Sequence, residues 1–386
     1  MKKIVFSFIV LISITSCKSQ QLAIETNIKK SDKQYSVLLD SAYMVNKIPR
    51  SLDEHGNIDW VKHNMDWTEG FFPGVCWKLY ESTKDEKWKK AADYFQNQFI
   101  EAKDVNTTHD LGFMFYCSFG EGYKLTKDEK YKQVVIDASN ALISRFEPKV
   151  GCIKSWDFGK DKWTFPVIID NMLNLEMLFE ASILTGDEKY RNVAISHADV
   201  TLKNHFRKDY STWHVVDYNP KDGTVFKKLT HQGIADDSRW ARGQGWALYG
   251  YTMCYRYTKD PKYLEQAKNV AKLVTANLSD DYVPVWDFDV KDPKIMYKDA
   301  SAGALYASAF IELYQYINNP QYKNLATKIL TSLSSDKYFS KYGENKGFLL
   351  MHSVGNFPKN GEIDVPINYA DYYYLEALLR LKKLNK

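Results

Sequence analysis

A six-residue motif that returns along the chain constrains the fold more than any other feature. It reads Thr-Lys-Asp-Glu-Lys followed by an aromatic residue at positions 83–88 and 126–131, and is here called the link motif. Related copies begin at residues 185, 258 and 317, so successive copies start 43, 59, 73 and 59 residues apart. Self-similarity at such spacings indicates a repeated supersecondary unit.

The chemistry of the link motif predicts a tight connection between two helices. An apolar helix ends at the threonine, and the Asp or Asn two residues later caps the next helix by accepting from free backbone N–H groups. Pro261 and Pro320 stand at the first helical position, where the missing N–H of proline costs nothing. The aromatic residue that ends the motif is expected to point into the core. Each copy therefore predicts a helical hairpin.

Apolar residues between the copies recur at helical spacing, as Phe71, Val75 and Leu79 do. The pattern predicts twelve helices near residues 32–46, 68–83, 86–103, 110–126, 128–147, 166–185, 187–205, 239–258, 260–278, 299–317, 320–335 and 366–384. Six such hairpins would close into an all-α (α/α)6 barrel. The short connections between helices would lie at one rim of the barrel, so the longer connections would lie at the other rim. These longer connections carry the Trp, His, Asp and Gly residues typical of a sugar site.

The N-terminus indicates export. Lys2 and Lys3 precede an apolar stretch over residues 5–14, which is too short to span a membrane with its flanks. The segment 14–17, Ile-Thr-Ser-Cys, then looks like a bacterial lipobox with Cys17 as the lipidated first mature residue. The alternative is an ordinary signal peptide with a chance cysteine.

These features divide the chain into three parts. We expect a lipoprotein signal peptide over residues 1–16, a polar tether over 17–30 and a single catalytic barrel over 31–386. The mature protein would be periplasmic and held to the membrane only by its lipid, with the cell surface as the alternative location.

The composition excludes some partners. A formal net charge of +4 with scattered basic residues gives no reason to expect nucleic acid. The four cysteines beyond Cys17 lack paired metal-site spacing and are expected to be buried thiols, with one disulfide possible. His109, His214 and His231 resemble a scattered metal triad, but hydrogen bonding to sugar is the favoured interpretation, so no metal is expected.

Two aspartates are the candidate catalytic groups. Asp110 and Asp170 each stand at the start of a predicted inner helix and are 60 residues apart, which is one hairpin. Adjacent inner helices would therefore hold two carboxyl groups across one cavity, and carboxyl groups in different environments can divide acid and base roles. The apolar run 166–169 should raise the pKa of Asp170, while the helix N-terminus opposes that rise. The alternative is that each Asp only caps its helix.

A further segment, residues 230–246, is dense in polar and aromatic side chains. The planar guanidinium group of Arg242 could bind, through two hydrogen bonds, the carboxylate that every uronic acid carries. Trp240 and Trp246 could stack on sugar rings. The alternative is a capped helix start with tryptophans that pack in the core.

Together, the segments 66–74, 107–113, 170–176 and 230–246 resemble glycoside hydrolase family 88, the unsaturated glucuronyl hydrolases. The resemblance runs from about residue 30 to the C-terminus. It implies the (α/α)6 barrel, no cofactor, Asp170 as general acid/base and Asp110 as the second essential carboxylate, which grips the sugar. The positions that it implies for substrate binding are Trp67, His109, Trp156, His214, His231, Gln232, Trp240, Arg242, Trp246 and Ser353.

The reaction that the resemblance implies is a hydration. The substrate is an acidic oligosaccharide whose terminal uronic acid carries the C4=C5 double bond left by a polysaccharide lyase. Asp170 would protonate C4 and then activate a water that adds to C5. The resulting hemiketal opens and releases the remaining chain.

One departure concerns the last long loop, residues 351–360. Some family members that accept sulfated amino sugars carry a Ser and Lys cluster there, whereas this chain has Ser353 without a lysine close behind it. Products of 6-sulfated chondroitin are therefore in doubt, and heparin-type, unsulfated and ulvan fragments stay open. The alternative functions are an unsaturated rhamnogalacturonyl hydrolase, a non-catalytic glycan-binding lipoprotein and an epimerase on the same barrel.

Overall fold

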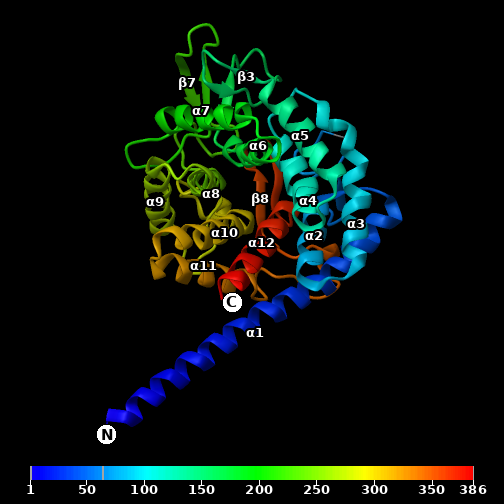
Figure 1. The fold of residues 1–386 in the computed structure, drawn as a ribbon, viewed down its shortest axis with the longest axis vertical. Coiled ribbons are helices and arrows are strands. Elements are labelled where there is room, and N and C mark those ends of the chain that lie inside the picture. Colours follow the sequence, from blue (N-terminus) through cyan, green and yellow to red (C-terminus); the bar gives the residue numbers. More distant parts are fainter. Residues whose placement is uncertain (1, 63–64, 386) are drawn as a thin grey trace.

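The computed structural model describes the backbone of residues 2–62 and 65–385, with side chains from residue 24 onward. Six helical segments form a closed inner ring, in which the last helix packs against the first (Figure 1). The ring consists of α2 (Phe71–Thr83), η2 (Gly112–Gly120) continued by α4 (Glu121–Thr126), α6 (Asn171–Thr185), α8 (Ala241–Thr258), α10 (Ala300–Ile317) and α12 (Asn368–Leu384).

An outer layer of helices surrounds this ring. It consists of α1 (Lys2–Val45), α3 (Glu86–Gln96) extended by the 3-10 helix η1 (Asn97–Asp104), α5 (Glu129–Ile143), α7 (Glu188–Asn204), α9 (Pro261–Ala276) and α11 (Pro320–Leu333). From α3 onward, each outer helix packs on the inner helix that precedes it. The predicted (α/α)6 barrel is confirmed.

The five link motifs have the predicted geometry. In each, the capping side chain accepts from the backbone N–H two residues on; the caps are Asp85, Asp128, Asp187, Asp260 and Asn319. The residue before each cap takes the left-handed conformation that ends the inner helix, at Lys84, Lys127, Gly186, Lys259 and Asn318. The aromatic residue that ends each motif is buried.

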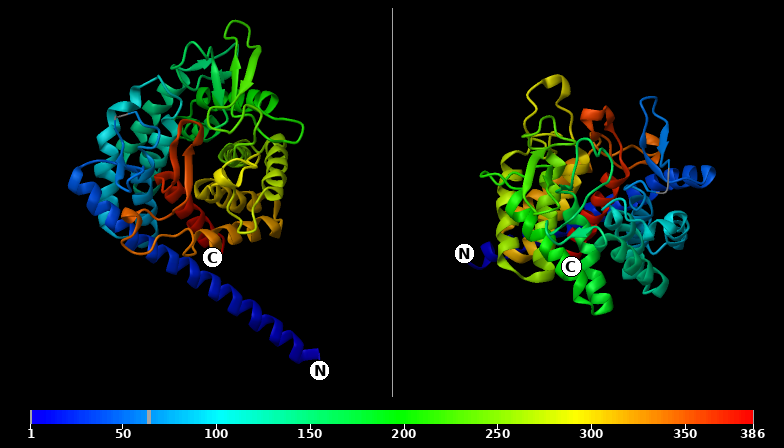
Figure 2. Two further views of the ribbon diagram at one scale, coloured as in Figure 1. Left: turned by 180° about the vertical axis from the view of Figure 1, so that it is seen from behind. Right: turned by 90° about the horizontal axis from the view of Figure 1, so that it is seen from above.

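The opposite rim carries small antiparallel sheets that the periodicity did not predict. They are β1 (Pro49–Leu52) with β2 (Ile58–Trp60), β3 (Phe146–Glu147) with β4 (Cys152–Ile153), β5 (Pro166–Ile168) with β6 (Val215–Tyr218) and β7 (Val225–Leu229), and β8 (Ser353–Asn356) with β9 (Gly361–Val365). These strands are two to five residues long, too short for an alternating pattern to stand out. The right view of Figure 2 shows the blue β1–β2 and orange β8–β9 hairpins on one side of the ring.

The inner helix after Asp110 differs from the continuous α-helix that was predicted. Its first part, η2, is a π-helix, a rare form that is often found at functional sites. A Cβ on Gly112 would lie 2.5 Å from the Cα of Asn174, so only glycine allows η2 to come this close to α6. The Asn174 side-chain oxygen accepts from the backbone N–H of Phe113 at 2.9 Å. These contacts bring the starts of η2 and α6, and hence Asp110 and Asp170, together.

The N-terminal boundary also differs from the prediction. Within α1, Ile24 and Ile28 are buried, and the Asn27 amide donates to the Ser334 hydroxyl at 3.0 Å. Residues 24–30, assigned above to the tether, therefore pack on the barrel. The Cys17 side chain lies outside the described residues. Across the described chain, no helix is both long enough and apolar enough to cross a membrane. The other cysteines, Cys76, Cys117, Cys152 and Cys254, are buried and free.

The link motifs make a stability prediction. Asn319→Ala should lower the free energy of unfolding by about 1 kcal/mol, because Asn319 caps α11. Asn319→Asp is the matched control, since aspartate also caps and its charge favours a helix N-terminus. Denaturant titration of the three proteins would measure this. Equal stability of the alanine variant and the wild type would contradict the capping role.

Candidate active site

Asp170 lies at the N-terminus of α6, directly after the β5 strand. It is 8% exposed, makes no capping hydrogen bond, and its Oδ2 has no hydrogen-bond partner among the described residues. Burial raises the pKa of Asp170 to about 7; the neighbouring charges of His109 and Arg242 oppose this rise, and Asp110 adds to it. The carboxyl group can therefore hold a proton near neutral pH, and the alternative of a simple helix cap does not apply.

Asp110 occupies a more polar position. Its side chain is 22% exposed and accepts from the Thr108 hydroxyl at 2.7 Å. His109 Nε2 lies 3.2 Å from Asp110 Oδ1, and the His109 backbone N–H donates to the carbonyl of Ser155. The two aspartates thus have different surroundings, as the sequence predicted.

His214 is placed as a neutral donor facing Asp170. Its Nδ1 accepts from the backbone N–H groups of His231 and Gln232, both at 3.1 Å, so the ring hydrogen resides on Nε2. Burial lowers the pKa of His214 well below its usual value, and the charge of His231 adds to this effect. Nε2 lies 3.6 Å from Asp170 Oδ2, which is outside hydrogen-bond range but suited to closing on a charged carboxylate.

An aromatic platform formed by Trp156, Phe158 and His231 lies close to the aspartates. The Trp156 and Phe158 rings stack with centroids 5.0 Å apart, and the His231 ring lies 5.3 Å from Trp156. Phe158 is 55% exposed, so the platform reaches solvent. Burial lowers the pKa of His231 to about 4, and the charges of two nearby lysines, Lys359 and then Lys162, contribute. The sequence reading missed Phe158 and both lysines, because only the fold brings residues 158–162 and 359 together.

Arg242 has protein partners at the site, and its contact with the substrate carboxylate stays a prediction. Arg242 is 1% exposed, and its Nη1 donates to Asp299 at 3.0 Å. The two terminal nitrogens also donate to the carbonyls of Val354 and Gly355, at 2.5 and 2.6 Å. Both terminal nitrogens thus have protein acceptors, and through them Arg242 holds the β8–β9 hairpin at the site. The Gln232 side chain donates to the same Gly355 carbonyl at 2.9 Å.

The other predicted binding residues divide into two groups. Trp240 stacks on the His214 ring at 4.5 Å, and Trp67 is partly exposed beside Tyr369 at 4.9 Å, so both lie at the site. Trp246 is fully buried between Phe113 and Tyr373, and this position favours the packing alternative. Ser353 is also fully buried, at the start of β8, and its hydroxyl has no hydrogen-bond partner among the described residues.

Tyr369 is a further candidate, which the sequence did not predict. It is buried, and within the described chain its hydroxyl has no hydrogen-bond partner. Its ring lies 5.3 Å from the Arg242 guanidinium and packs on Trp67. The only sequence signal was its place in the region, from about residue 30 to the C-terminus, over which the family resemblance runs.

The assembled groups can protonate, deprotonate and stack on a sugar. Asp170 is a buried acid with a free oxygen, Asp110 is a hydrogen-bonding carboxylate, and the platform offers flat faces. In the part of the chain that the structure describes, no three His, Cys, Asp or Glu side chains are arranged to hold a metal ion.

Comparisons with known proteins show the family to which the chain belongs. The model of Glycosyl Hydrolase Family 88 matches residues 41–380. An unsaturated glucuronyl hydrolase of Formosa agariphila is 46% identical, with 100% of this chain and 99% of that protein covered. An unsaturated chondroitin disaccharide hydrolase of Streptococcus pneumoniae is 33% identical, with coverage of 85% and 84%.

Solved structures match in the same way. The crystal structure of an unsaturated glucuronyl hydrolase specific for heparin superposes with a TM-score of 0.89 at 43% identity, and covers 94% of this chain and 97% of that one. By sequence and by structure, the chain belongs to Glycosyl Hydrolase Family 88 and is a glycoside hydrolase.

Proposed function

We propose that the protein removes the terminal 4,5-unsaturated uronic acid from lyase-generated acidic oligosaccharides by hydrating the C4=C5 double bond. The observation that carries this proposal is Asp170, one buried carboxyl group that holds a proton near neutral pH and has a free oxygen. A hydration needs one group that first gives a proton and then takes one. Two relatives of this chain are named an unsaturated glucuronyl hydrolase and an unsaturated chondroitin disaccharide hydrolase.

In the first step, protonated Asp170 gives its proton to C4 of the sugar. The electrons of the double bond form the new C–H bond, and positive charge develops at C5 and the ring oxygen. Asp170 becomes a carboxylate that faces the Nε2–H of His214. Asp110, which is close enough to affect the charge state of Asp170, stabilises the cationic transition state and holds ring hydroxyls.

In the second step, the Asp170 carboxylate takes a proton from water while the water oxygen bonds to C5. This returns Asp170 to its acid form and produces a hemiketal. The ring then opens, C5 becomes a ketone, and C1 releases the rest of the oligosaccharide as an alcohol. Asp170 gives one proton and takes one back, so the proposed reaction uses no cofactor.

The aromatic platform and its charges indicate which kind of sugar follows the uronic acid in the substrate. Lys162 and Lys359 are close enough to lower the pKa of His231, so they place positive charge beside an exposed aromatic face. This arrangement favours a carboxylated or sulfated sugar over the neutral rhamnose of the rhamnogalacturonyl alternative. Heparin-type, chondroitin and ulvan products all satisfy that chemistry.

The location is a separate proposal and rests only on the sequence. The lipobox over residues 14–17 supports a lipid anchor on Cys17, and a periplasmic enzyme would meet lyase products as small oligosaccharides.

Asp170→Asn should lower turnover at least about 100-fold while binding persists, because an amide cannot give and then take a proton. The assay follows the ultraviolet absorbance of the double bond in unsaturated heparin, chondroitin and ulvan disaccharides, with saturated disaccharides as negative substrates. Asp371→Asn is the matched control, since Asp371 is also buried but accepts from the backbone of Leu349 and Leu350. Comparable cleavage of saturated substrates would overturn the hydration mechanism.

The value of kcat/KM should fall as pH rises through about 7, because deprotonation removes the acid form of Asp170. His231, whose pKa is about 4, is already neutral near pH 7, and so is His214. Neither histidine therefore adds a second change to the pH–rate profile in this range. A pH–rate profile on one disaccharide measures this. Activity that stays level from pH 6 to pH 9 would contradict Asp170 as the acid.

Cys17→Ala should release the protein from the membrane fraction and leave specific activity unchanged. Fractionation of cells that express each form, with activity assays on both fractions, checks this. A variant that remains membrane-bound would exclude the lipid anchor. Loss of the wild type on protease treatment of whole cells would place the enzyme outside.

A further inference from the structure

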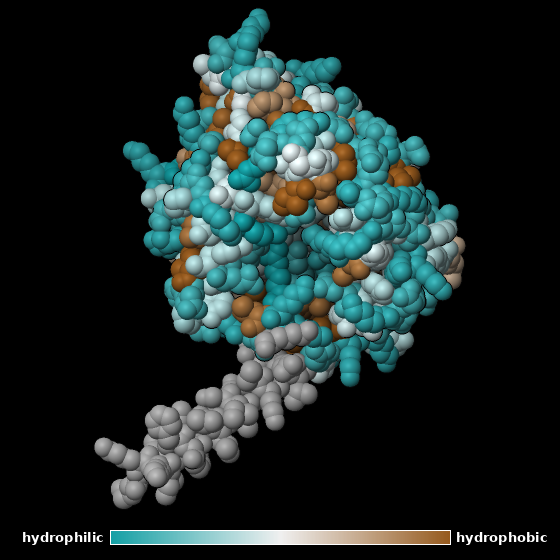
Figure 3. All heavy atoms as spheres, in the orientation of Figure 1, coloured by the Kyte–Doolittle hydropathy of each residue, from teal (hydrophilic) through white to brown (hydrophobic). Residues whose placement is uncertain are grey.

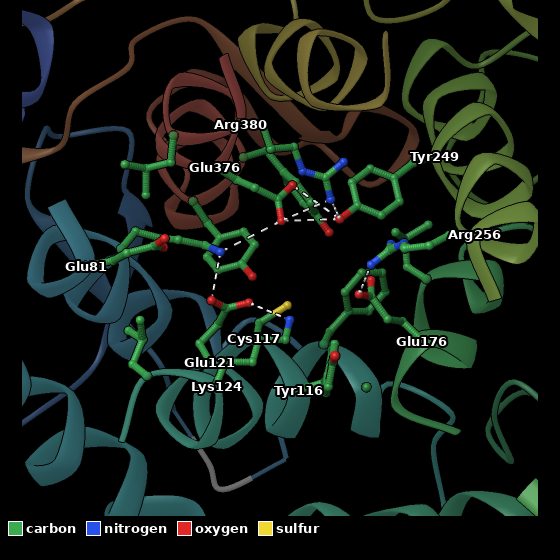
Figure 4. Close-up of a pocket in the computed structure, with 18 of the residues that line it drawn as sticks. Glu81, Tyr116, Cys117, Glu121, Lys124, Glu176, Tyr249, Arg256, Glu376 and Arg380 are labelled. Atoms are coloured by element: carbon green, nitrogen blue, oxygen red, sulfur yellow. Dashed lines mark hydrogen bonds and ion pairs between the residues drawn. The ribbon is translucent and has the colours of Figure 1, made fainter. Parts of the chain in front are cut away.

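A second cavity lies at the other end of the barrel, at the rim of the link motifs. Its volume is about 400 Å³, and inner-helix residues line it, from Gly112 and Leu173 near the starts of η2 and α6 to Lys383 near the end of α12 (Figure 4). Figure 3 shows a hydrophilic hollow at the centre of this face. Glu176, on its wall, follows Asp170 by six residues on α6, roughly 9 Å along the helix axis.

An aromatic layer lies between this cavity and the catalytic end. Phe113 lines the cavity, and its ring also contacts Trp67 at 5.4 Å and Trp246 at 5.2 Å. Tyr373 lines it too and contacts Trp246 at 5.7 Å. The cavity extends as far as Gly112 and Leu173, and the Phe113 and Tyr373 rings line its inner end.

The charges on the wall are paired with one another. Lys78 lies 2.8 Å from Glu121, which also binds Lys124 at 3.1 Å. Arg256 lies 2.9 Å from Glu176. The remaining charges connect these pairs: Arg380 lies 3.6 Å from Glu376, which is 3.9 Å from Lys78, and Glu312 contacts both Arg256 and Arg380. A bare ion would have to break one of these pairs, so the cavity does not suit one.

Two donors on the wall are nevertheless unsatisfied. Tyr116 is 7% exposed, and its hydroxyl has no partner in the described structure. Nη2 of Arg256 is likewise buried without an acceptor among the described side chains. Leaving such groups unpaired is unfavourable, so a ligand that supplies oxygen acceptors would gain by filling the cavity.

The rest of the wall fits a polyhydroxylated ligand. Glu176 and Glu376 offer acceptors for hydroxyl protons, and the rings of Tyr372 and Tyr373 offer faces for C–H groups. We propose that this cavity binds a neutral monosaccharide or a polyol of similar size, as a second site distinct from the catalytic one. Its volume lies within the usual range for small-molecule sites.

The test is a ligand-observed NMR titration of the full chain with D-glucose, N-acetyl-D-glucosamine and L-rhamnose as probes. At least one should saturate, and Tyr116→Phe should weaken its binding by about fivefold to tenfold, because one hydrogen bond is lost from an otherwise intact wall. Tyr123→Phe, on the same helix segment but outside the cavity, is the matched control and should bind normally.

A variant of the catalytic platform separates the two sites. Trp156→Ala should leave the binding of the probe unchanged, since Trp156 lies at the other rim. Binding lost in Trp156→Ala but kept in Tyr116→Phe would assign the sugar to the catalytic site and overturn the proposal. Absence of saturation by all three probes would overturn it as well, provided that wild type and variants melt at the same temperature.

Discussion

The capped reversal in the link motif is the constraint on which the rest of the structure depends. At each copy, a left-handed residue ends an inner helix and the next Asp or Asn caps the outer helix that returns beside it. Because every copy reverses the chain at the same rim, every inner helix begins at the opposite rim. The long returns therefore share one face with six helix N-termini, and this arrangement creates the catalytic face.

Catalysis then depends on how deeply one carboxyl group is buried on that face. Asp170 follows a strand of the β5–β6–β7 sheet and is covered by His214 and its neighbours, so burial outweighs the cations that would keep it charged. Asp110, with more exposure and a hydroxyl partner, stays in polar surroundings. The same ring geometry leaves a second opening at the link rim. There, paired charges rather than loops form the wall, so the two ends of one barrel offer different chemistry.

Much of the fold could be predicted from the sequence, because the link motif acts between residues that are close together in the chain. Asp85 and Trp88, or Asn319 and Tyr322, act within a few residues of each other, so their caps and burial follow from spacing alone. The strands at the other rim escaped prediction because they are only two to five residues long, and pairs such as Val167 with Val216 also join distant segments. The π-helical start of η2 escaped for the same reason: its close approach to Asn174 is a contact between two helices.

By itself, the sequence determined the hairpin repeat, the pair of aspartates one hairpin apart and the family to which the chain belongs, because each resides in local motifs that recur in order. Only the tertiary structure decided what each side chain does. The guanidinium group of Arg242 was expected to be free for the substrate, yet it donates hydrogen bonds to Asp299 and to carbonyls of β8. Trp246 looked like a sugar platform, yet the fold buries it and exposes Phe158 instead. The physical reason is that burial and hydrogen-bond partners are supplied by residues far away in the chain, which no local pattern encodes.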